Sequence, residues 1–114
     1  MTTPSADLLP PTQDLITMLG HAEEGVRVYA AVRLGSPGRA DGAAVSALVG
    51  LLRSEAMIDR RVAALALGKV GPAAREAVPA LLEAMGASDD GGFRAFAAEA
   101  ISRIETGAAP RRAA

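Results

Sequence analysis

The chain has 114 residues, a length that suits one domain with one modest hydrophobic core. Cysteine is absent, which excludes disulfides, thiolate nucleophiles and cysteine-ligated metal centres and favours a reducing compartment such as the cytoplasm. The net charge is -1, from 12 basic and 13 acidic side chains, so no overall field draws the chain to nucleic acid or to an anionic membrane. The excess of arginine over lysine and the abundant alanine fit a GC-rich bacterial genome.

Six segments space their apolar residues at intervals of three and four, the pattern of an amphipathic helix. The predicted helices span 12–20, 22–35, 42–53, 56–70, 76–86 and 92–105. The flanking segments, 1–11 and 106–114, have little periodic apolar content and are predicted to be flexible. The chain contains no apolar run of the roughly 18 residues that a membrane helix needs, and its first residues lack the features of a signal peptide.

Helix-breaking and helix-capping residues separate these segments. Gly35-Ser36-Pro37-Gly38 and Gly71-Pro72 interrupt the helical pattern. Thr12, Asp41 and the Asp89-Asp90 pair carry side chains that can cap the helix that follows. Pro79 fits only the first turn of a helix, so a short turn over 72–76 is expected before it.

The predicted helices fall into two alternating types that repeat every 33 or 34 residues. The first type is RVYAAVRLG at 27–35, RRVAALALG at 60–68 and, with serine in place of the last glycine, RAFAAEAIS at 94–102. The second type is leucine-rich and occurs as VSALVGLL at 45–52 and VPALLEAM at 78–85, with the same apolar positions in TQDLITML at 12–19.

Arginine, paired alanines, leucine and glycine in this order, followed by a leucine-rich helix, resemble HEAT repeats, in particular the short repeats of phycobilin lyases. The resemblance covers about residues 12–105. It implies an all-α fold, an α-α superhelix (HEAT-like solenoid) of about six helices whose second helix in each hairpin lines the concave face. The signature residues of tetratricopeptide and ankyrin repeats are missing.

Small alanines at 30–31, 63–64 and 97–98 should let successive hairpins approach closely, while Leu48, Leu52, Leu81 and Leu82 should fill the layer between them. The resemblance also implies structural pairs between each motif arginine and an acidic residue at the preceding turn. Arg27 would pair with Glu23 or Glu24, Arg60 with Glu55, and Arg94 with Asp89 or Asp90.

Residue types that carry catalysis are sparse, so no catalytic, cofactor or metal site is predicted. His21 is expected to be a helix-end residue, because no nucleophile or oxyanion loop accompanies it and Glu23 and Glu24 make a weak metal set with it. Asp89-Asp90-Gly91-Gly92 lacks the ligand spacing of an EF-hand, and Gly68-Lys69 lacks the rest of a phosphate loop.

The leading hypothesis is therefore a non-catalytic adaptor or scaffold that binds another protein. If the leucine-rich helices face the groove, their outward positions are the candidate contacts: Gln13, Thr17, Ser46, Gly50, Arg53, Glu76 and Glu83. The C-terminal end of the stack is the other candidate surface. There Phe93 is expected to be exposed and available for a homodimer or partner contact, whereas Phe96 is expected to pack in the core.

Two other functions remain open. An enzyme or accessory subunit related to phycobilin lyases would act on a bilin, but one His, one Tyr and no Cys provide no recognisable pigment site. A nucleic-acid-binding module would use a local patch of Arg53, Arg60, Arg61 and Arg75, which the balanced net charge and the lack of stacking aromatics disfavour.

Overall fold

The computed structural model describes residues 10–36 and 41–107. They form the helices α1 (Thr12–Met18), α2 (Glu24–Leu34), α3 (Gly42–Leu51), α4 (Met57–Val70), the 3₁₀ segment η2 (Gly71–Ala77), α5 (Val78–Gly86) and α6 (Gly91–Thr106). These ranges contain no strand, which confirms the all-α prediction. None of the described helices is long and apolar enough to cross a membrane. The predicted flexible segments fall largely on residues 1–9 and 108–114, outside the described ranges.

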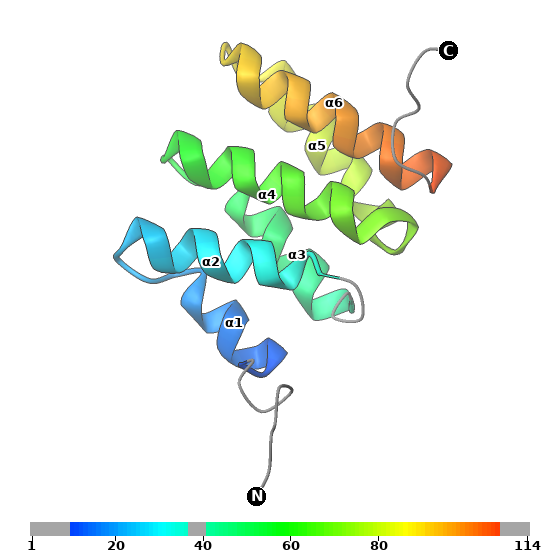
Figure 1. Ribbon diagram of the computed structural model, residues 1–114. Coiled ribbons are helices and arrows are strands. Elements are labelled where there is room, and N and C mark those ends of the chain that lie inside the picture. The colour runs from blue at the N-terminus through cyan, green and yellow to red at the C-terminus, as the bar shows by residue number, and fades with distance from the viewer. Residues whose placement is uncertain (1–9, 37–40, 108–114) are drawn as a thin grey trace, which may run out of the picture.

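The helices form two layers. Figure 1 shows α2, α4 and α6 side by side, with α3 and α5 behind them and α1 next to α2 at the N-terminal end of the stack. Contacts pair α1 with α2, α3 with α4 and α5 with α6, so each hairpin begins with a leucine-rich helix and ends with an arginine-containing one. This corrects the expectation that placed the leucine-rich helices second. The second helices of the hairpins are α2, α4 and α6.

Glycines set the close spacing of the α2/α4/α6 layer. A Cβ atom on Gly35 would lie 2.8 Å from the carbonyl oxygen of Ala66, and one on Gly68 would lie 3.0 Å from the Cα of Ala100. In the other layer, α1 meets α3 only lightly and α3 packs on η2. Because the more closely spaced layer of a curved stack lies on its inner side, we call α2/α4/α6 the inner layer and α1/α3/α5 the outer layer.

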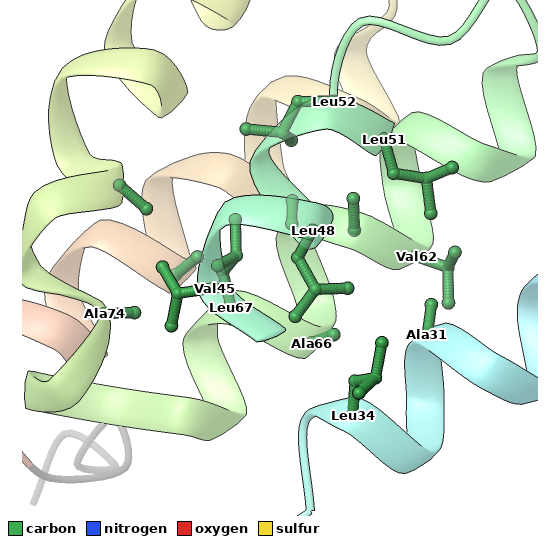
Figure 2. Close-up of a cluster of buried hydrophobic side chains, with 14 of the residues drawn as sticks. Ala31, Leu34, Val45, Leu48, Leu51, Leu52, Val62, Ala66, Leu67 and Ala74 are labelled. Carbon is green, nitrogen blue, oxygen red and sulfur yellow. The ribbon is translucent and has the colours of Figure 1, made fainter. Parts of the chain in front are cut away.

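Leucines from the outer layer fill the space between the layers. Figure 2 shows Val45 of α3 beside Leu67 of α4 and Leu48 of α3 on the side of Leu34 of α2, with Leu52 at the opposite end of the same cluster. The alanine pairs at 30–31 and 63–64 are fully buried, as predicted. Two expectations are wrong. Leu82 is 56% exposed because it lies on the outward side of α5, and Ala98 is exposed because no other described helix covers that side of α6.

Helix ends follow the predicted chemistry with one exception. The Asp41 side chain accepts a hydrogen bond from Ala44 N at 2.8 Å, and the Asp90 side chain accepts from Gly92 N and Phe93 N. Both are N-caps. Thr12 is not a cap, because it is already the first helical residue and Pro11 holds the extended cap conformation. The turn expected before Pro79 is the 3₁₀ segment η2.

The burial of the two phenylalanines is the reverse of what was predicted. Phe93 is fully buried, because it shares one face of α6 with Ala97, Ala100 and Ile104 at spacings of four, three and four. Phe96 is 39% exposed. The Gly68–Ala100 seam is too narrow for a phenyl ring, so this ring lies beside Leu65 in a shallow hollow between α4 and α6.

Candidate functional site

The three hairpin turns share one local hydrogen bond. At 21, 54 and 88, a side chain accepts a hydrogen bond from the backbone N–H two residues later. The acceptors are His21 Nδ1 at 3.0 Å, Ser54 Oγ at 3.1 Å and Ser88 Oγ at 3.0 Å. This bond gives His21 the structural role expected of a helix-end residue. Within residues 10–36 and 41–107 no cluster of acidic or histidine side chains is arranged to hold a metal ion.

Two of the three motif arginines, Arg27 and Arg60, hold the turn that precedes their own helix. Arg27 Nη1 donates to the carbonyl oxygens of His21 and Ala22, both at 2.9 Å. Arg60 Nη1 donates in the same way to the carbonyls of Ser54 and Glu55, at 2.8 and 3.1 Å. These bonds satisfy carbonyls that have no partner within a helix. The repeated arginine therefore fixes the turn through the backbone.

The acidic partners of the arginines lie in the next repeat. Arg27 Nε donates to both carboxylate oxygens of Asp59, at 2.9 and 3.1 Å, and Ser54 Oγ donates to the same carboxylate at 2.7 Å. Arg61 forms a bidentate pair with Asp90, at 2.6 and 2.8 Å. We call these two pairs the arginine ladder. It ties α2 to α4 and α4 to the start of α6.

The ladder corrects the predicted pairings. The expectation matched Arg27 with Glu23 or Glu24, Arg60 with the Glu55 side chain and Arg94 with Asp89 or Asp90. In the structure, Asp59 lies in the first turn of α4 and Asp90 is the N-cap of α6, where a carboxylate faces the preceding helix and the positive end of its own helix dipole. The hydrogen bonds from Arg61 are the largest cause that lowers the pKa of Asp90 to about 2, and desolvation opposes them.

An open groove lies between the second and third hairpins on the side of their turns. Its volume is about 620 Å³, and we call it the inter-repeat groove. Its floor comes from α3 and α5, and its walls are the turn before α4 and the turn before α6. Arg53 and Glu83 face each other across it at 3.9 Å, with both side chains exposed.

The inner layer exposes large apolar side chains. Tyr29, Ile58, Leu65 and Phe96 are each between 37% and 40% exposed, and we call this surface the inner face. On α4, Ile58 and Leu65 share one helical stripe with Lys69, because these positions are seven and four residues apart. On α2, the Arg33 guanidinium lies 5.3 Å from the centroid of the Tyr29 ring.

A family model for HEAT repeats matches residues 12–102. The chain belongs to the HEAT-repeat family. The match describes HEAT repeats as a class and does not specify the phycobilin-lyase type. No curated protein matches this chain at a significant level.

The contact residues predicted from sequence lie on the outer layer of this HEAT-repeat protein. All are exposed: Gln13 and Thr17 of α1, Ser46 and Gly50 of α3, Arg53 just after α3, Glu76 of η2 and Glu83 of α5. Only Arg53 and Glu83 are brought together, at the inter-repeat groove. No other atom lies within 4 Å of where a Cβ on Gly50 would stand, so nothing within the described structure requires glycine there.

The expectation that Phe93 is exposed is wrong. A side chain with no exposed surface cannot make a homodimer or partner contact. Sequence reasoning also missed the inner face. Its signal was present in the sequence, because Tyr29, Leu65 and Phe96 are large apolar residues in helices whose core positions are alanine and leucine. The sequence pattern did not show which of the two helix types comes first in a hairpin.

Proposed function

We propose that this HEAT-repeat protein is a non-catalytic adaptor that binds another protein through its inner face. The observation that carries the proposal is the set of large apolar side chains exposed on α2, α4 and α6, which are Tyr29, Ile58, Leu65 and Phe96. Such a group of exposed apolar side chains is costly in water and marks interaction surfaces. Aromatic anchors of this kind often carry much of the affinity of an interface.

The charges beside these side chains indicate the chemistry of the partner. Arg33 and Lys69 are exposed on the inner layer, and Arg103 and Glu99 of α6 form an ion pair at 3.0 Å that neutralises both. The inner face is therefore apolar with a positive border. An amphipathic partner segment with acidic residues beside its apolar ones would fit it best.

A non-catalytic role is favoured over an enzymatic one by what the candidate groups already do. The chain has one histidine, and His21 Nδ1 accepts a hydrogen bond from the backbone at the end of α1. No hydroxyl donates to that nitrogen within the described residues, so the His21 ring is not seen to activate a nucleophile there. A role related to the phycobilin lyases gains no support from these groups.

Nucleic-acid binding is disfavoured by the use of the four arginines proposed for it. Arg60 donates to backbone carbonyls, Arg61 is held by Asp90, and Arg53 faces Glu83. Arg75 lies on η2. Because three of the four are engaged or paired, they do not form a free basic stripe of the kind that follows a phosphate backbone.

The test is affinity capture from the native lysate with mass spectrometry, comparing the wild type with a Leu65→Ser, Phe96→Ser variant. A matched control carries Gln13→Ala and Ser46→Ala on the outer layer, and circular dichroism checks that both variants fold. We expect a specific protein that the wild type and the control recover and the inner-face variant loses. Loss only with the control variant would move the site to the outer layer, and recovery of no protein by the wild type would contradict the adaptor role.

A further inference from the structure

The inter-repeat groove is a second surface, separate from the inner face, and its walls are held rigidly. One wall is the turn at 53–56, where Ser54 accepts from Ala56 N and Arg60 donates to two carbonyls. The other wall is the turn at 87–90, where Ser88 accepts from Asp90 N and the Asp90 carboxylate caps α6. Walls that are already ordered lower the entropy cost of binding a ligand.

The floor of the groove is apolar. Leu52 closes its base and is 2% exposed, and the half-buried Val49, Ala80 and Ala84 extend the apolar surface. Met57 stands at the edge and is 45% exposed, so it is available for contact. The volume of about 620 Å³ falls within the range of ligand sites, roughly 300–1,000 Å³. A leucine- or methionine-sized side chain would be well covered there.

The rim of the groove is acidic. Apart from Asp90, which is paired with Arg61, three carboxylates and two guanidinium groups line it, a net charge of -1. Glu55 and Asp89 are exposed and form no ion pair within residues 10–36 and 41–107, and Glu83 has only the loose 3.9 Å contact with Arg53. Arg60 is already engaged with the backbone of the turn. The groove therefore favours a cationic group beside its apolar floor.

We propose that the inter-repeat groove binds an extended segment of a partner protein in which a basic side chain lies next to a large apolar one. The apolar side chain covers Leu52 and Ala84, and the basic one lies between Glu55 and Asp89. A second copy of this chain is a poorer occupant. Its Tyr29 and Leu65, the apolar side chains that lie near basic residues, are only 38% and 40% exposed on their own layer.

The test is selection of random decapeptides displayed on phage against the full-length protein, followed by fluorescence polarisation of the enriched peptides. We expect enrichment of peptides with Lys or Arg adjacent to Leu, Met or Phe. A Glu55→Lys, Asp89→Lys variant should bind them at least about tenfold more weakly. A Glu76→Lys, Glu105→Lys variant makes the same charge change at exposed positions outside the groove and should bind as the wild type does.

A second variant tests the floor without changing charge. Ala84→Leu places a larger side chain into the groove, and leucine is a good helix former, so α5 should form normally. We expect it to weaken peptide binding by about tenfold or more, as a filled hot-spot pocket does. Circular dichroism and thermal unfolding confirm that the variant is folded.

Four results would overturn the proposal. One is enrichment without the basic and apolar pair, and another is equal affinity for the wild type and both groove variants. The third is a wild-type dimer in light scattering that the groove variants convert to a monomer, which would make a second copy the occupant. The Leu65→Ser, Phe96→Ser variant separates this site from the proposed adaptor surface, since it should bind the peptides normally. Loss of binding there would place the peptides on the inner face.

Discussion

The inner and outer layers of this HEAT-repeat protein differ in how closely their helices pack. In the inner layer, glycine and alanine let α2, α4 and α6 approach until backbone meets backbone, as at Gly35 against Ala66. In the outer layer, leucines point inward to fill the core and leave the helices separated from one another. The close layer exposes large apolar side chains on its surface, whereas the separated layer opens a groove.

The two layers also differ in their ion pairs. The Arg27–Asp59 pair of the arginine ladder is shielded, with the Asp59 side chain only 4% exposed, whereas the Arg53–Glu83 pair of the outer layer is exposed on both sides. Burial decides what such a pair contributes, since a shielded charge that loses its partner has no water to replace it. The shielded pair of the inner layer therefore specifies how the hairpins are oriented.

The largest expected effect comes from breaking the ladder. Asp59→Ala removes the carboxylate that both Arg27 and Ser54 contact, and we expect it to lower the free energy of unfolding by about 3 kcal/mol. Glu83→Ala removes an exposed partner in the outer layer and should change stability by about 0.5 kcal/mol or less. Urea unfolding followed by circular dichroism measures both. Equal effects would mean that the ladder does not distinguish the layers.

The next largest effect tests the close seam of the inner layer. Gly35→Val would bring a Cβ to 2.8 Å from the Ala66 carbonyl oxygen, which is backbone and cannot move aside. We expect a loss of about 2 kcal/mol, the cost of overpacking. The thermal unfolding midpoint reports it. A midpoint equal to that of the wild type would show that the seam is looser than its geometry indicates.

The opposite change is expected at the matched glycine of the outer layer. Gly50 lies inside α3 with open space around its missing Cβ. Gly50→Ala should therefore raise the free energy of unfolding by roughly 0.5–1 kcal/mol through helix propensity alone. Differential scanning calorimetry can detect the rise. A drop in stability would reveal a contact at this site that the open geometry does not account for.

The smallest expected effect is a loss of folding stability at low pH. The pKa of Asp90 is lowered from 3.8 to about 2, first by the hydrogen bonds from Arg61, so the folded state binds this proton less readily than the unfolded state. The stabilisation is present above pH 3.8 and is lost progressively as pH falls toward 2. Denaturant unfolding at several pH values should show an Asp90→Asn variant with a shallower loss. If the free energy of unfolding depends on pH in the same way in the wild type and in the variant, the Arg61–Asp90 pair makes no such contribution.

Local rules explain why most helices and caps are predictable from the chain alone. Asp41 and Asp90 cap helices because a short acidic side chain reaches only the amide groups directly after it. The burial of the alanine pairs at 30–31 and 63–64 follows from the repeat, since equivalent positions meet equivalent neighbours. Prediction failed at Ala98 and Phe96 because burial there depends on the surroundings of α6: no other described helix covers Ala98, and the narrow Gly68–Ala100 seam leaves no room for the Phe96 ring.

The amino-acid sequence by itself determined the helices, their repeat and the membership of the chain in the HEAT-repeat family, because these depend on spacing and composition within each segment. Only the tertiary structure decided which helix is second in each hairpin, that Arg27 pairs with Asp59, and that Phe93 is buried while Phe96 is exposed. The inter-repeat groove was decided in the same way. Each of these depends on which surfaces meet across repeats. The sequence pattern does not show which residues some 30 positions apart come into contact.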